Sequence, residues 1–199
     1  MITSKEEYKY YLKCDCIANS FDYKKIHFPG FNYTIRFLKI LRKCEYYKNC
    51  KSGIWYLPIK AILKIKLERA RLKYGWFIPL NVCEEGLSLP HCGPIIINCN
   101  SKIGRNCRIH VGVNIGTKAG YGDKAPIIGN NVYIAPGAKL FGDIYIGDET
   151  AIGANAVVTK SFSDGNAVLL GIPAVKSSDL IKNTYIERIP EEYIKEKRV

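Results

Sequence analysis

An aliphatic residue returns at every sixth position along two runs in the second half of the chain. The first run is Ile97, Ile103, Ile109 and Ile115, and the second is Ile128, Ile134, Leu140, Ile146, Ile152 and Val158. A period of six fits neither an α-helix nor a two-faced strand, whose side chains repeat every 3.6 and every two residues. It fits a coil of three short sides that each bury one aliphatic, and hexapeptide repeats are typical of the parallel β-helix. We therefore predict a mainly β fold, a β-helix of about five coils in which Ile115 stacks on Ile97.

The repeat is interrupted twice, and both interruptions bear on function. The step from Leu89 to Ile97 is eight residues long and contains a bulge, 90–94, that carries His91 between prolines and a glycine. The step from Ile115 to Ile128 is thirteen residues instead of twelve, and its segment 117–126 has no aliphatic anchor, which predicts an extruded loop. A histidine on a rigid scaffold beside a mobile loop is a plausible active-site arrangement.

Helices are predicted before the repeat, over residues 4–20, 33–47 and 58–74. Ser4 and Glu7 have the spacing of a capping box, and Gly75 is a suitable C-terminal cap for the third helix. We predict three regions: an N-terminal helical cap over the open end of the β-helix (1–75), the β-helix itself (76–174) and a charged tail (175–199). The third helix is basic and amphipathic, so it either packs on its own protein or lies on a membrane interface.

Composition narrows the functional classes. The chain of 199 residues has a formal net charge of +12, but the basic residues form no nucleic-acid-binding motif, and we expect no nucleic-acid partner. We expect a cytoplasmic protein, since the start of the chain has no apolar signal core and no apolar run is long enough to span a bilayer. Contact with the inner face of the membrane remains open. The eight cysteines form no Cys-x-x-Cys pair and are expected to be free thiols.

Four motifs together resemble the left-handed parallel β-helix, hexapeptide-repeat acyltransferases. They are Gly-Leu-Ser-Leu-Pro-His (86–91), Lys-Ile-Gly-Arg-Asn-Cys (102–107), Ile-Gly-Ala-Asn-Ala-Val-Val-Thr-Lys (152–160) and Gly-Ile-Pro-Ala (171–174). The branch that the chain resembles is the serine-acetyltransferase-like one, which includes O-acetyltransferases of bacterial surface polysaccharides. The resemblance implies a homotrimer with acetyl-CoA bound in the outer groove between subunits.

The resemblance also implies roles for individual residues. His91 is the general base, a task that suits imidazole because it titrates near neutrality. The positions implied for the coenzyme are Gly116, Thr117, Pro136, Gly137, Ala154 and Lys160, and those for the acceptor are Tyr121, Asp123 and Lys124. No metal is expected, because His27, His91 and His110 do not have the spacing of a three-histidine site.

Three departures from the serine acetyltransferases concern the acceptor. Trp76 occupies the position of the aspartate that orients the histidine, and Pro90 replaces the aspartate before it. Lys124 and Ala125 stand where the arginine–histidine pair of the loop is expected. Glu84, Glu85 or a backbone carbonyl remain as alternatives for orienting His91.

Our first hypothesis from the sequence is therefore transfer of acetyl from acetyl-CoA to a sugar hydroxyl of a surface polysaccharide precursor. Serine O-acetylation is the alternative, and a non-catalytic β-helix scaffold is a further one. The residues identify neither the hydroxyl that is modified nor the preferred acyl length.

Overall fold

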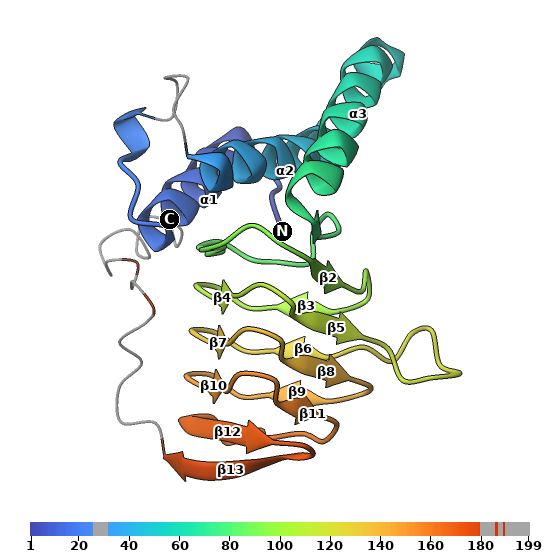
Figure 1. The fold of residues 1–199 in the computed structure, drawn as a ribbon. Helices are drawn as coiled ribbons and strands as arrows, with labels where there is room; N and C mark the ends of the chain where they lie inside the picture. Colours follow the sequence, from blue (N-terminus) through green and yellow to red (C-terminus); the bar gives the residue numbers. More distant parts are fainter. Residues whose placement is uncertain (26–31, 180–185, 187–188, 190–199) are drawn as a thin grey trace.

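A computed structural model describes residues 1–25, 32–179, 186 and 189 of the chain. A cap of helices lies on one end of a stack of coils, and the last two strands close the other end (Figure 1). None of the described helices is both long and apolar enough to cross a bilayer.

The cap consists of three long helices and two short 3₁₀ turns. These are α1 (Lys5–Ala18), η1 (Tyr23–Lys25), α2 (Tyr33–Cys50), η2 (Ile54–Tyr56) and α3 (Leu57–Tyr74). The Ser4 side chain accepts a hydrogen bond from the Glu7 N–H, as the capping box predicts. The Glu7 carboxylate, however, accepts from the Thr3 N–H at 2.7 Å. Gly75 ends α3 with φ +76°, in the left-handed region that favours glycine at this position.

The strands form the three faces of a parallel β-helix. Face A contains β1 (Trp76–Phe77), β2 (Ile95–Ile97), β5 (Asn114–Gly116), β8 (Lys139–Phe141) and β11 (Val157–Val158). Face B contains β3 (Lys102–Ile103), β6 (Ile127–Ile128) and β9 (Tyr145–Ile146). Face C contains β4 (Arg108–Ile109), β7 (Tyr133–Ile134), β10 (Ala151–Ile152), β12 (Ala167–Gly171) and β13 (Ala174–Asp179).

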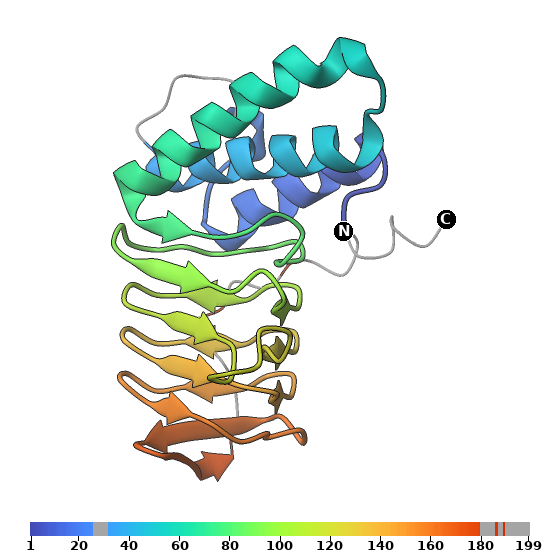
Figure 2. The same ribbon diagram turned by 90° about the vertical axis from the view of Figure 1, so that its right-hand side faces the viewer.

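The predicted eighteen-residue register is confirmed at Ile97, which pairs with Ile115. Across the loop the prediction is wrong, because Ile115 pairs with Leu140, 25 residues later (140 − 115). The step from Ile115 to Ile128 is therefore one side of a coil with seven extra residues (25 − 18), rather than two sides with one extra residue. All ten aliphatic anchors of the repeat are at most 4% exposed, so they form one continuous core along the axis of the stack. The coils lie above one another in both side views (Figure 2).

The end of the β-helix differs from the expected tail. Residues 174–179, most of which the sequence analysis assigned to the tail, form β13, which runs antiparallel to β12. Only β13 among the described strands pairs in this direction. Most of the remaining tail, residues 180–185, 187–188 and 190–199, lies outside the described residues.

A buried ion cluster joins the cap to the first coil. Arg42 on α2 is fully buried and pairs with Asp15 on α1 at 2.8 Å and with Glu45 at 3.0 Å. Its guanidinium also donates to the carbonyls of Cys83 (2.8 Å) and Glu84 (2.7 Å) in the first coil. Asp15 in turn accepts from two backbone N–H groups of that coil, those of residues 86 and 87. These bonds fix how the helices lie on the coil that carries the bulge.

Candidate functional site

His91 lies where the first coil turns from face C into face A. The residue before the bulge, Leu89, is fully buried, whereas the His91 side chain is exposed. Two side chains of α2 hold the start of the bulge, since Thr34 Oγ1 donates to the Leu89 carbonyl at 2.9 Å and Tyr33 Oη donates to the Pro90 carbonyl at 3.2 Å. The imidazole is therefore turned out of the core by a backbone segment that the cap anchors.

Gly93 allows the bulge to return to the stack. Its φ is +137°, and a Cβ at this position would lie 2.3 Å from Val111 Cγ2 of the next coil. Its N–H donates to the carbonyl of Tyr74 at the end of α3, at 3.0 Å. A larger residue would force the bulge away from the second coil.

The ring of His91 lies beside that of His110, a residue for which the sequence predicted no catalytic role. The ring centroids lie 5.9 Å apart, and the His110 ring also packs edge-on against Tyr133 at 5.1 Å. His110 is 8% exposed, and the Arg108 Nε–H donates to its Nε2 at 3.4 Å. Burial, with the charges of Arg108 and His91, lowers the pKa of His110 from 6.5 to about 4. His110 is thus a neutral ring beside His91 at physiological pH.

Neither carboxylate proposed to orient His91 lies at the bulge. Glu84 and Glu85 come before Ser88, at the other end of face C, where they meet the helices of the cap. Glu85 is buried there and contributes to the raised pKa of Tyr10 and Tyr11, after the larger effect of their burial. Within one chain, neither carboxylate is therefore placed beside His91.

Trp76 does not contact the bulge through a polar group. Its side chain is fully buried in an aromatic cluster, 5.0 Å from Phe37, 5.3 Å from Tyr74 and 6.0 Å from Tyr33 between ring centroids. The position that resembles the orienting aspartate therefore serves packing between the cap and β1.

A polar cleft of about 280 Å³ opens beside the bulge, between the cap and face C. Its lining includes Tyr33, Thr34, Ser88, Pro90 and Arg108. The Ser88 hydroxyl is buried and has no hydrogen-bond partner among the described residues. The cleft thus offers one cation and one unused hydroxyl next to the segment that carries His91.

The extruded loop begins at the other end of face A, after β5. The Lys118 N–H donates to the Lys124 carbonyl at 3.1 Å and closes the base of the loop. The Tyr121 ring lies between the ammonium groups of Lys118 and Lys124, at 5.2 and 5.6 Å from its centroid. Lys124 also pairs with Asp143 at 3.3 Å. Figure 1 shows this loop projecting from the side of the coils.

A second cavity, of about 560 Å³, lies under the start of this loop. It is lined mainly by apolar groups, including Ala119, Phe141 and Ile144, with Thr117 and Thr159 at its edge. Lys160 follows Thr159, and its ammonium lies 5.5 Å from the centroid of the Phe162 ring. The sequence analysis did not single out Phe141, because it is an outward-facing residue between two repeat positions.

The predicted site residues fall into two groups within one chain. Pro136, Gly137 and Ala154 lie below the bulge, in turns that connect face C to face A. Thr117, Tyr121, Asp123, Lys124 and Lys160 lie at the opposite end of face A, and Gly116 ends β5 there. A three-residue strand separates the two groups by about 10 Å. One chain therefore does not bring its loop to its own His91.

No metal centre accompanies these residues: the described part of the chain has no group of three or more His, Cys, Asp or Glu side chains that could hold an ion. His27 lies outside the described residues.

Comparison with known proteins finds a matching family and similar serine acetyltransferases. The family of bacterial transferase hexapeptide (six repeats) matches residues 125–160. The serine acetyltransferase of Mycobacterium tuberculosis is 32% identical over 122 residues, which are 60% of this chain and 53% of that protein. That of Staphylococcus aureus strain Mu50 is 41% identical over 88 residues, 44% of this chain and 41% of that protein. The chain spans about half the length of these curated relatives.

Solved structures agree on the fold. A serine acetyltransferase in complex with cysteine has a TM-score of 0.66 at 22% identity and covers 84% of this chain and 69% of its own. The Brucella abortus enzyme in complex with coenzyme A has a TM-score of 0.60 at 20% identity, with coverages of 88% and 69%. The β-helix is left-handed, as predicted, and the resemblance to the serine-acetyltransferase-like branch of the hexapeptide-repeat transferases is confirmed.

Proposed function

We propose that this chain, a hexapeptide-repeat protein similar to serine acetyltransferases, transfers acetyl from acetyl-CoA to a hydroxyl group. The observation that carries the proposal is the exposed His91 on an anchored bulge at the edge of the coils. An imidazole with free access to solvent is a suitable general base for an alcohol.

In the proposed reaction, His91 removes the proton of the acceptor hydroxyl while the oxygen attacks the thioester carbonyl. The tetrahedral oxyanion then collapses, the C–S bond breaks, and the CoA thiolate takes the proton from the imidazolium. Neutral His110 beside His91 suits this exchange, because it adds no second positive charge when the base becomes protonated.

The cavity under the loop fits the chemistry of the donor. Its apolar lining suits a pantetheine arm, and Lys118 in the lining would attract phosphate groups, as would Lys160, which follows the lining residue Thr159 in the sequence. Thr117 lines this cavity. The coenzyme roles implied for Pro136, Gly137 and Ala154 require a second groove, along the turns that connect face C to face A. Bringing the two groups together requires a second copy of the chain, which supports the proposed homotrimer with Tyr121, Asp123 and Lys124 reaching a neighbour's His91.

L-serine is the acceptor that the relatives favour, since the matched curated proteins are serine acetyltransferases. A sugar hydroxyl is the second candidate, favoured by buried Trp76 at the position of the orienting aspartate and by Lys124, which is paired within its own chain. The polar cleft with Ser88 and Arg108 suits either acceptor. We place the reaction in the cytoplasm, as expected from the sequence.

The test is acceptor-dependent release of CoA from acetyl-CoA, with L-serine and with sugars as separate acceptors. We expect His91→Ala to lower turnover about 10²–10⁴-fold, and Cys92→Ala, in the exposed neighbour, to leave it unchanged. Unchanged turnover in His91→Ala would refute the mechanism. A wild-type trimer that neither binds acetyl-CoA nor releases CoA would favour the non-catalytic scaffold.

A further inference from the structure

The helix α3 is apolar on two opposite sides. Leu63, Leu67 and Ala70 are buried against the cap, as in an ordinary surface helix. The opposite side carries large apolar residues that are exposed: Ile62 at 53%, Ile65 at 53% and Leu72 at 74%. A single exposed leucine needs no explanation, but a continuous stripe does.

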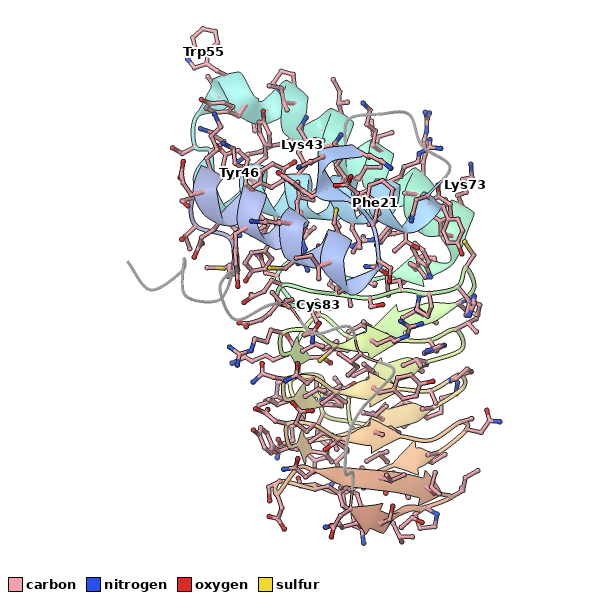
Figure 3. All side chains as sticks on the ribbon, turned by 90° about the vertical axis from the view of Figure 1, so that its left-hand side faces the viewer. Phe21, Lys43, Tyr46, Trp55, Lys73 and Cys83 are labelled. Atoms are coloured by element: carbon pink, nitrogen blue, oxygen red, sulfur yellow. The ribbon has the colours of Figure 1, made fainter. Side chains whose placement is uncertain are left out.

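The stripe continues into the turn before the helix. Ile54 is 70% exposed, Trp55 is 87% exposed and Leu57 is 57% exposed. Trp55 lies at the end of the cap farthest from the β-helix and points away from the protein (Figure 3). We call η2 and the outward side of α3, with these six residues, the apical surface.

Basic residues border the apical surface. Within residues 51–75 there are seven lysines and arginines but one acid, Glu68, which pairs with Arg71 at 2.7 Å. Lys64, Lys66, Arg69 and Lys73 are exposed on the helix. A second copy of the same surface would bring these charges against their like, which is unfavourable. A partner of negative charge is favoured instead.

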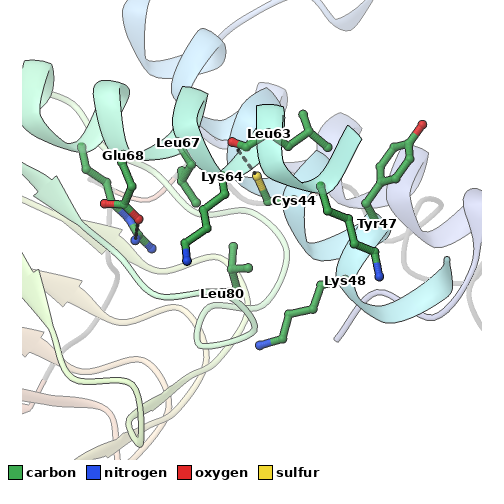
Figure 4. Close-up of a pocket in the computed structure, with 10 residues that line it drawn as sticks. Cys44, Tyr47, Lys48, Leu63, Lys64, Leu67, Glu68 and Leu80 are labelled. Carbon is green, nitrogen blue, oxygen red and sulfur yellow. Dashed lines mark hydrogen bonds and ion pairs between the residues drawn. The ribbon is translucent and has the colours of Figure 1, made fainter. Parts of the chain in front are cut away.

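The inward edge of α3 has the same combination of apolar and basic groups. A cavity of about 290 Å³ lies between α2 and α3, with Leu63, Leu67 and Leu80 in its lining and Lys48 and Lys64 at its mouth (Figure 4). An apolar space with ammonium groups at its mouth suits an amphiphile whose head carries negative charge.

We propose that the apical surface docks the protein on an anionic lipid bilayer. Trp55, Ile62, Ile65 and Leu72 enter the boundary between head groups and acyl chains, while the lysines meet the acidic head groups. The later coils then stand away from the bilayer, because α3 lies at the opposite end of the molecule from β13 (Figure 1). The bulge with His91 lies near the C-terminal end of α3, where the Gly93 N–H donates to the Tyr74 carbonyl. The proposal is independent of the acetyl transfer.

The experiment is co-sedimentation of the full chain with vesicles. We expect binding to phosphatidylcholine vesicles that contain about 30% phosphatidylglycerol, little binding to phosphatidylcholine alone, and release at about 1 M salt, where the Debye length is about 3 Å. Equal binding to both vesicle types, or to neither, would overturn the proposal.

Two variants test the apical surface itself. Trp55→Ser should weaken binding roughly tenfold or more, whereas Ile172→Ser, a residue 74% exposed beyond the last coils, should not. Replacing Lys64, Lys66 and Lys73 with glutamine should weaken it about 10²-fold, from about fivefold for each lysine. Replacing three exposed lysines elsewhere with glutamine (24, 25 and 102) removes the same charge and should have a much smaller effect.

Circular dichroism of each variant shows whether it is folded, and sedimentation velocity shows whether its assembly has changed. Together they separate a loss of bilayer docking from misfolding or altered assembly. Wild-type binding retained in the Trp55 and triple-lysine variants would overturn the proposal. A smaller assembly in these variants, without vesicles, would assign the apical surface to contact between copies and would also overturn it.

Discussion

Replacing Arg42 tests how the cap is held on the coils. Arg42→Met keeps much of the side-chain volume but removes two ion pairs and five hydrogen bonds, two of them to backbone carbonyls. Asp15 and Glu45, 1% and 2% exposed, would keep buried charges without their cation. Asp15 would retain the hydrogen bonds from two backbone N–H groups of the first coil.

Breaking a buried pair by removing one partner costs about 3–5 kcal/mol. For a chain of this length, each kcal/mol lowers Tm by about 2–4 °C, so the expected fall is roughly 6–20 °C. Thermal unfolding followed by circular dichroism at pH 7 measures it. Arg36→Met is the matched control, because Arg36 lies on the same helix but is exposed, and it should change stability by less than about 0.5 kcal/mol.

The pH dependence gives an independent check. Burial raises the pKa of Asp15 above 3.8, while the charge and hydrogen bonds of Arg42 lower it. Loss of Arg42 would therefore raise the pKa of Asp15 further. A carboxyl whose pKa is raised by folding stabilises the protein at low pH and loses that contribution as the pH rises through its folded pKa. The variant should therefore recover part of its lost stability as the pH falls below 7. A variant within about 1 kcal/mol of wild type at pH 7 would refute the reasoning.

Two further predictions concern the bulge and its neighbour. His110 has its pKa lowered to about 4, so its contribution to stability is complete above pH 6.5 and is lost as the pH falls towards 4; His110→Phe should flatten this part of the Tm profile, and an unchanged profile would contradict the burial argument. Gly93→Ala should cost about 1–3 kcal/mol in chemical denaturation, because of its φ and the contact with Val111, whereas Gly122→Ala has open space and should be neutral; equal effects would exclude strain in the bulge.

The β-helix could be predicted because one aliphatic at every sixth position determines both the faces and the register. Ile97 and Ile115 were enough to predict the eighteen-residue stacking of their own two strands. The bulge lengthens the offset to 20 residues (108 − 88) and the loop lengthens it to 25 (140 − 115). The strand β13 could not be predicted in the same way. Val175, Lys176 and Ser177 are all exposed, so none of them carries the buried aliphatic signal that marks the other strands. Their pairing depends on the turn before them, which contains the Gly-Ile-Pro-Ala motif (171–174).

The site was predicted less completely than the fold. His91 was identified because the step from Leu89 is two residues too long, which is visible in the sequence. His110 was missed because the same two residues shift the stacking: Ser88 pairs with Arg108, twenty positions later, so His110 follows beneath the start of the bulge. Applying the twenty-residue offset at this one step would have placed the two histidines together.

The antiparallel direction of β13 affects how the open end of the β-helix can pair with another chain. Parallel coils leave a row of unpaired backbone groups at their last turn, and such a row is a template for adding another chain. A strand that returns antiparallel presents a different hydrogen-bond pattern, and its outward residues include the charged Lys176 and Asp179. On face C, the charged antiparallel strand β13 is therefore the terminal strand, which disfavours end-to-end addition of another chain at that face.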